Sequence, residues 1–173
     1  MRHIIQTLLF CFLITNSLLS HADNNAGVGM HESTSEDVQA ITKVTEDFRK
    51  GLITKDTKLL SSLMLNSNVL FSSAASPENT RITQQKMDVN FDGISLGGYK
   101  EFALFLFNEK KPIEEKFYNI KITQDGHVAW VMFDYEFVVD GKTENYGIET
   151  WQLIKTSEEK WKIFSVVWSV HLL

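Results

Sequence analysis

The chain has 173 residues, of which 43% are hydrophobic and 23% charged, and its formal net charge at pH 7 is −5. A chain of this length can build one domain with a real hydrophobic core. Its acidity, and the lack of a cluster of Lys and Arg, argue against nucleic acid or an anionic membrane surface as a partner.

The first 22 residues have the three parts of a secretory signal peptide. Arg2 provides the positive start, an apolar run follows over residues 4–19, and small residues stand at Ser20 and Ala22. The apolar run is short for a membrane span of about 20 residues, so we expect cleavage near Ala22 and no stable membrane anchor. The protein is then exported, to a periplasm or to the extracellular space. The only cysteine, Cys11, leaves with the signal, so the mature chain holds no disulfide and no thiol nucleophile.

Residues 23–34 are polar and aperiodic, which predicts a flexible tail before a single domain over residues 35–173. Ser33 and Glu36 form a Ser-x-x-Glu capping box, the usual start of a helix. Apolar residues then recur every three or four positions over residues 38–52, which predicts the first helix.

The middle of the chain is mixed. Asp56 can cap a second, short helix, and residues 69–71 predict a brief strand. Residues 72–98 are rich in Ser, Asn, Asp and Gly and predict a long loop of the kind that forms lids or rims. Residues 99–107 predict a third helix that is apolar almost all round.

After Pro112 the pattern changes to strands, which are predicted over residues 117–123, 128–139, 143–156 and 161–171. Asp140 and Gly141 predict a two-residue hairpin turn, because both residue types tolerate positive φ. Helices come first and an antiparallel meander last, which indicates an α+β domain.

The hairpin turn sets a register in which Trp130 lies opposite Trp151. One face of the sheet then carries Trp130, Met132, Asp134, Glu149 and Trp151, joined by Val166 and Trp168 from the last strand. Both faces are largely apolar, whereas in a sheet with one face exposed to solvent, apolar and polar residues alternate along each strand. Helices can cover one face, and we expect a second copy of the chain to cover the other, as a homodimer packed through its sheets. A bulge in the last strand would exchange its two faces.

Residues 127–169 contain a G-x-E-x-x-x-L pattern that starts at Gly147, then Trp161-Lys162-Ile163, and a terminal Trp168-Ser169. These patterns and the order of elements resemble the SnoaL-like branch of the nuclear transport factor 2-like superfamily, which also contains ketosteroid isomerase. The resemblance implies a cone-shaped fold with three N-terminal helices packed on a curved antiparallel sheet. It also implies a pocket between helices and sheet, whose ligand-binding residues would be Phe48, Trp130, Met132, Asp134, Glu149, Trp151, Val166 and Trp168.

The chain differs from these relatives at the positions of their catalytic residues. By the resemblance, Phe48, Ser72 and Trp151 stand where ketosteroid isomerase has its oxyanion donors and its base. Ser165 and Val167 replace two histidines that many SnoaL-like relatives carry in the last strand. The sequence therefore argues against ketosteroid isomerisation and against any activity that needs those histidines.

Asp134 and Glu149 are the candidate acid–base pair, because carboxylates in an apolar wall can have a raised pKa. Alternatively they form hydrogen bonds to a ligand, are solvated at an open rim, or pair with a basic residue. Trp130, Trp151 and Trp168 form either an aromatic box for a flat or cationic ligand or part of the core. The histidines lack metal-ligand spacing, so we expect no metal and no cofactor.

Three hypotheses for function follow. The first is a noncatalytic, homodimeric, exported domain that binds a small apolar or aromatic molecule. The second is an enzyme of the lyase, isomerase or hydrolase type that uses Asp134 and Glu149, and the third is an interaction module with a filled pocket. A raised carboxylate pKa beside an empty cavity favours the enzyme, an aromatic cavity without a polar pair favours the binding protein, and a filled core favours the interaction module.

Overall fold

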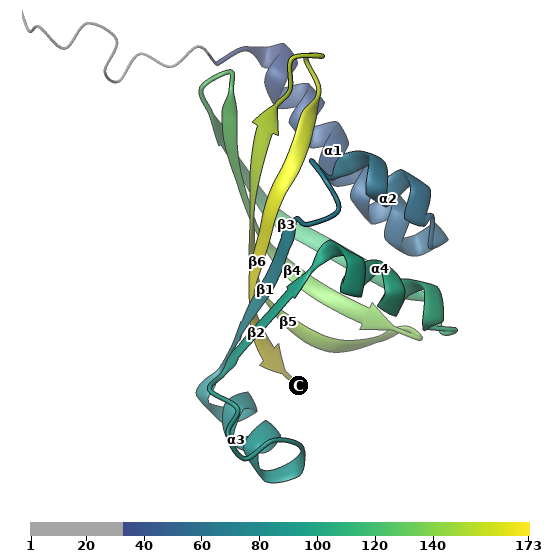
Figure 1. The fold of residues 1–173 in the computed structure, drawn as a ribbon, viewed down its shortest axis with the longest axis vertical. Coiled ribbons are helices and arrows are strands. Elements are labelled where there is room, and N and C mark those ends of the chain that lie inside the picture. Colours follow the sequence, from purple (N-terminus) through teal and green to yellow (C-terminus); the bar gives the residue numbers. More distant parts are fainter. Residues whose placement is uncertain (1–32) are drawn as a thin grey trace, which may run out of the picture. The chain divides into compact units, whose positions relative to one another are not determined.

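A computed structural model describes residues 33–173 as four helices and one six-stranded sheet (Figure 1). The predicted α+β class is confirmed. None of the helices in this part of the chain is both long and apolar enough to cross a membrane. The signal peptide, its cleavage near Ala22 and almost all of the tail predicted over residues 23–34 lie outside the described residues and stay predictions.

Helices α1, α2 and α4 lie on one side of the sheet, and α3 lies at its far end (Figure 1). The helices are α1 (Ser35–Thr54), α2 (Thr57–Leu63), α3 (Pro77–Lys86) and α4 (Tyr99–Asn108). The cap of α1 is Thr34, whose Oγ1 accepts the backbone N–H of Asp37 at 3.1 Å. The predicted cap at Ser33 is wrong by one residue. The Ser33 hydroxyl instead accepts a hydrogen bond from the side-chain amide of Gln124. Asp56 caps α2 as predicted.

The sheet has the strand order β2-β1-β6-β5-β4-β3. Its strands are β1 (Leu70–Ala75), β2 (Ile94–Gly98), β3 (Ile113–Gln124), β4 (Val128–Val139), β5 (Lys142–Lys155) and β6 (Trp161–Leu172). All neighbouring pairs are antiparallel except β1 and β6, which are parallel. The curved sheet is therefore mixed, and the prediction of a purely antiparallel sheet is wrong. Strands so far apart in the chain can pair in either direction, because no hairpin turn fixes their orientation.

The prediction of a long loop over residues 72–98 is also wrong. This segment contains the end of β1, helix α3 and the edge strand β2. Ser76 caps α3 and Pro77 occupies its first turn, a favourable start for a helix. Of the α3 side chains only Asn79 is buried, and no residue of β2 is buried. Elements that contribute so little to the core leave no apolar periodicity in the sequence.

Bulges in the sheet decide which side chains face the helices. The predicted turn at Asp140 and Gly141 is confirmed, since Val139 pairs with Lys142. The ladder then shifts, so that Val138 pairs with Thr143 but Phe137 pairs with Asn145, and Glu144 is the extra residue. A bulge of one residue exchanges the two faces of everything beyond it.

As a result, Trp151 lies opposite Val131 and not opposite Trp130. Trp130 is 52% exposed and Met132 39% exposed on the outer face of the sheet, and Asp134 is exposed there too. The predicted placement of these three residues on the pocket face is therefore wrong. A second bulge leaves Phe164 unpaired between β5 and β6.

The inner face of the sheet carries the core. Phe48 from α1 lies over Trp151, with 4.8 Å between ring centroids, and Phe133 and Phe117 meet the same indole edge to face. Trp151 is fully buried. This arrangement of aromatic rings is favourable beyond the area it buries, and it holds α1 across the sheet.

Candidate functional site

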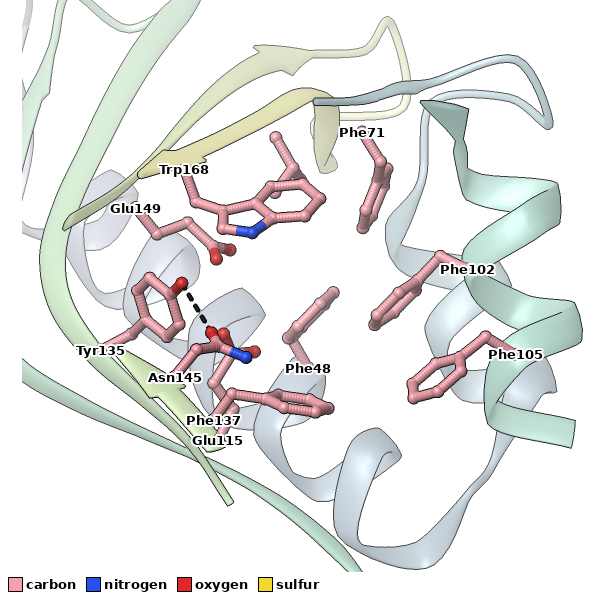
Figure 2. Close-up of a pocket in the computed structure, with 11 residues that line it drawn as sticks. Phe48, Phe71, Phe102, Phe105, Glu115, Tyr135, Phe137, Asn145, Glu149 and Trp168 are labelled. Atoms are coloured by element: carbon pink, nitrogen blue, oxygen red, sulfur yellow. Dashed lines mark hydrogen bonds between the residues drawn. The ribbon is translucent and has the colours of Figure 1, made fainter. Parts of the chain in front are cut away.

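A cavity of about 230 Å³ lies between α1, α4 and the inner face of the sheet (Figure 2). We call it the aromatic pocket, because most of its wall is aromatic. It is lined by Phe48, Phe71, Phe102, Phe105, Glu115, Tyr135, Phe137, Asn145, Glu149, Val166 and Trp168. The core is thus not filled at this end of the sheet.

The apolar wall is built from several elements. Phe102 and Phe105 project from α4 toward the cavity (Figure 2), at the spacing of three that places side chains on one side of a helix. The ring of Phe102 stacks on that of Phe71 from β1, with centroids 4.9 Å apart, and is parallel to the ring of Phe48 at 6.2 Å. Trp168 from β6 meets Phe71 edge to face. The cavity therefore presents ring faces and ring edges from both layers of the domain.

Two carboxyl groups form the acidic part of the wall. Glu115 comes from β3 and Glu149 from β5, and their residues are only 6% and 4% exposed. The two carboxyl groups are close enough for each to shift the pKa of the other. The indole N–H of Trp151 donates to Glu149 Oε1 at 2.5 Å. We call Glu115 and Glu149 the carboxyl pair.

Burial raises the affinity of the carboxyl pair for protons. Burial raises the pKa of Glu149 to about 7, although the hydrogen bonds from Trp151 and Glu115 act to lower it. Burial and the neighbouring charge of Glu149 raise the pKa of Glu115 well above its ordinary value. Because the two carboxyl groups interact, they titrate as a unit.

Tyr135 lies beside the carboxyl pair and helps to shape the wall. Its hydroxyl is 2.9 Å from Asn145 Oδ1 (dashed in Figure 2) and 2.9 Å from the Ser169 carbonyl oxygen. Burial, and then the charges of the two glutamates, raise the pKa of Tyr135, so it stays a neutral phenol. The Ser169 carbonyl can turn inward because residue 147 is a glycine: a Cβ there would lie 2.2 Å from the Ser169 oxygen. This close approach is the structural reason for Gly147 in the sequence pattern above.

The structure brings together half of the ligand-binding residues predicted from the sequence. Phe48, Glu149, Val166 and Trp168 all line the aromatic pocket. Trp151 faces inward as predicted, but it lies in the core beneath the pocket and contributes its N–H to Glu149.

The predicted pair of Asp134 and Glu149 is wrong, because the bulge at Glu144 places the two residues on opposite faces of the sheet. On the outer face, Asp134 accepts a hydrogen bond from the Asn119 amide at 2.6 Å. The three tryptophans predicted as a box are separated for the same reason, with Trp130 outside, Trp151 in the core and only Trp168 in the pocket.

The sequence reasoning missed the partner that Glu149 does have. Strand β3 was predicted to begin at residue 117, but it begins at Ile113. The alternation of Ile113, Glu115 and Phe117 would have placed Glu115 on the inner face with its two apolar neighbours. Phe102 and Phe105 also carried a detectable signal, since both lie on one side of the predicted third helix.

No protein-family model matches the chain, and no curated protein matches it. Several solved structures do. A nuclear transport factor 2-like superfamily protein from Salmonella enterica serovar Typhimurium has a TM-score of 0.58 and 21% identity, over 82% of this chain and 95% of that one. A nuclear transport factor 2-like protein of unknown function from Pseudomonas putida has a TM-score of 0.58 and 8% identity, over 79% and 87%. A dehydratase candidate of the same family from Streptomyces avermitilis has a TM-score of 0.54 and 17% identity, over 80% and 98%. The chain therefore has the nuclear transport factor 2-like fold.

Proposed function

We propose that this protein is an exported small-molecule-binding domain whose aromatic pocket holds an apolar or aromatic ligand. The observation that carries this proposal is the cavity itself, enclosed by aromatic side chains from both layers of the domain. An apolar cavity of about 150 Å³ is large enough for benzene, so about 230 Å³ suits a ligand of one or two rings. The N-terminal pattern at residues 1–22 supports export, which follows from the signal peptide and not from the fold.

Binding is tested by native mass spectrometry of the protein purified from its own host, followed by titration with 2-naphthol under tryptophan fluorescence. Phe102→Ala removes part of the wall and weakens 2-naphthol binding by about tenfold. Phe107→Ala is the matched control, because Phe107 lies on the same helix, is 70% exposed and does not line the pocket. Absence of any co-purified molecule together with no 2-naphthol binding would contradict the proposal.

A second candidate is an acid–base enzyme, a lyase or an isomerase, that works through the carboxyl pair. It is favoured by a carboxyl of raised pKa beside an empty cavity, which is the arrangement that a general acid or base requires. The dehydratase candidate of similar fold is consistent with it. We place it second because Tyr135 is already engaged, and among residues 33–173 no Lys, Arg or His lines the cavity to stabilise a developing negative charge.

The enzyme is tested by incubating the co-purified ligand with the protein in deuterated water. Proton transfer through Glu149 incorporates deuterium into a carbon position of the ligand, which mass spectrometry detects. Glu149→Gln abolishes that incorporation, whereas a noncatalytic protein gives none with either form.

We also propose a homodimer packed through the outer face of the sheet. That face exposes apolar side chains on three adjacent strands, among them Trp130 and Met132 on β4, Ile148 on β5 and Val167 on β6. Exposed apolar patches of this kind support a protein contact. Light scattering is expected to give a dimer for the natural chain and a monomer for Met132→Lys; a monomeric natural chain would contradict this part of the proposal.

A further inference from the structure

The wall of the aromatic pocket favours positive charge. The wall presents seven aromatic rings, two carboxyl groups, one amide and one valine, and among residues 33–173 it presents no Lys, Arg or His. Aromatic ring faces carry partial negative charge and attract cations, most strongly where water is excluded. Both features of the wall therefore favour a positive charge inside the cavity and disfavour a negative one.

The carboxyl pair has no cation to balance it. In the described part of the chain neither Glu115 nor Glu149 takes part in an ion pair. The pair receives one N–H from outside itself, that of Trp151, although each ionised carboxylate can accept several hydrogen bonds. The carboxyl oxygens of Glu149 point toward the cavity (Figure 2). Both residues are more than nine-tenths buried, so bulk water solvates them poorly.

We propose that the ligand of the aromatic pocket is an organic cation: a small amine or quaternary ammonium compound with an apolar or aromatic body. Its charged group lies against Glu149 and the ring of Trp168, and its body lies against the rings of Phe48, Phe71 and Phe102. This inference rests on the proposed binding function and specifies its ligand class. A neutral ligand would fill the cavity but leave the charge of the carboxyl pair without a partner.

Binding of a cation favours the ionised form of the carboxyl pair, because opposite charges attract. Ligand binding is therefore coupled to the loss of a proton from the pair. The titratable and charged groups around Glu149 are Glu115 from β3, Tyr135 from β4 and Arg49 from α1. The Nε–H of Arg49 donates to the Glu115 backbone carbonyl at 3.2 Å, its guanidinium lies over the Phe117 ring, and Arg49 does not line the cavity. α4 and β6 contribute no titratable side chain to the wall. Affinity for a cation should therefore rise between pH 6 and pH 8, and a proton should be released on binding at pH 6.

The test compares two probes of the same shape. Benzyltrimethylammonium is a cation, and neopentylbenzene has a carbon in place of its nitrogen. Fluorescence titration of the purified protein at pH 8 is expected to show the cation binding at least about tenfold more tightly. Calorimetry of the cation in two buffers of different ionisation heat measures the proton released at pH 6.

Two variants make the comparison specific. Glu149→Gln keeps the shape of the side chain but not its charge, so the preference for the cation should fall to about twofold or less, with folding checked by circular dichroism. Glu144→Gln is the matched control, because it removes the same charge from an exposed position of the same strand and should keep the preference of the natural chain.

Each outcome separates this inference from the proposed function. Equal affinity for the two probes, or a co-purified ligand that is neutral or anionic, overturns the cation inference and leaves the binding function intact. A preference for the cation that survives in Glu149→Gln also overturns it. Failure of both probes and of 2-naphthol to bind overturns the binding function and the inference together.

Discussion

The inner face of the sheet holds two buried acidic sites with opposite surroundings. At one end, Asp37 of α1 accepts the indole N–H of Trp161 at 2.9 Å and forms an ion pair with Lys155 at 3.0 Å. At the other end, Glu115 and Glu149 lie beside a cavity, and neither forms an ion pair within residues 33–173. The hydrogen bonds from Trp161 and Lys155 lower the pKa of Asp37, whereas burial raises the pKa of Glu149.

The difference separates a structural acid from one available to a ligand. Asp37 is also within hydrogen-bonding distance of its cap residue Thr34, so its carboxylate is satisfied and ties α1 to the β5–β6 hairpin. The carboxyl pair has unused acceptor capacity facing a cavity, at a cost in stability when it ionises. Sites that reduce stability in this way are often functional.

The largest expected effect comes from removing the structural acid. Asp37→Ala should lower the free energy of unfolding by about 3 kcal/mol, since it leaves the Trp161 N–H and the Lys155 ammonium without their partner. Urea denaturation at pH 7 measures the loss. Asp47→Ala is the control, because Asp47 belongs to an exposed pair with Lys43 and should change stability by less than about 0.5 kcal/mol. Equal losses in the two variants would contradict the distinction drawn here.

The two sites should also respond to pH with opposite signs. The folded pKa of Asp37 lies below its unfolded value, so its contribution is present above about pH 4 and is lost as the pH falls through the folded pKa. The folded pKa of Glu149 lies above its unfolded value near 4.5, so the folded state loses stability as the pH rises from there to about 7. For the natural chain we expect greatest stability near pH 4–5, with a fall on the order of 3 kcal/mol by pH 8. A maximum at pH 7–8 in urea denaturation would refute this reading.

Removing one charge from the carboxyl pair should stabilise the fold. Glu149→Gln keeps an acceptor for the Trp151 N–H and eliminates a poorly solvated negative charge, so we expect a gain of about 2 kcal/mol at pH 8 and almost none at pH 4. Parallel thermal and urea unfolding at both pH values would measure it. A loss of stability at pH 8 would show that the pair is structural, like Asp37.

An effect of similar size on stability should follow from adding a side chain at Gly147. Gly147→Ala places a methyl group against the Ser169 carbonyl, and the displacement should cost about 2 kcal/mol. It should also weaken ligand binding, because moving the Ser169 carbonyl disturbs the hydrogen bonds that hold Tyr135 and Asn145 in the pocket wall. Gly141→Ala is a useful comparison: its Cβ meets no other atom within 4 Å, so its cost comes only from positive φ. Similar ligand affinity in both variants would mean that Gly147 does not position the site.

Much of the fold was predictable because it depends on local patterns. The apolar spacing over residues 38–52 identified α1, and Asp140-Gly141 identified the β4–β5 turn. Helix α3 and strand β2 were missed because their side chains are mostly exposed, so no periodicity marks them. The parallel pairing of β1 with β6 was missed because no local signal specifies it.

By itself the sequence determined the types and order of most elements, and hence the α+β class and the nuclear transport factor 2-like resemblance. Only the tertiary structure decided which residues of β4 meet which residues of β5. The physical reason is that side chains alternate along a strand with a period of two, so the one extra residue at Glu144 moved Asp134 out of the pocket. The meeting of Glu115 with Glu149 was decided in the same way, because it depends on how β3 and β5 align on either side of β4.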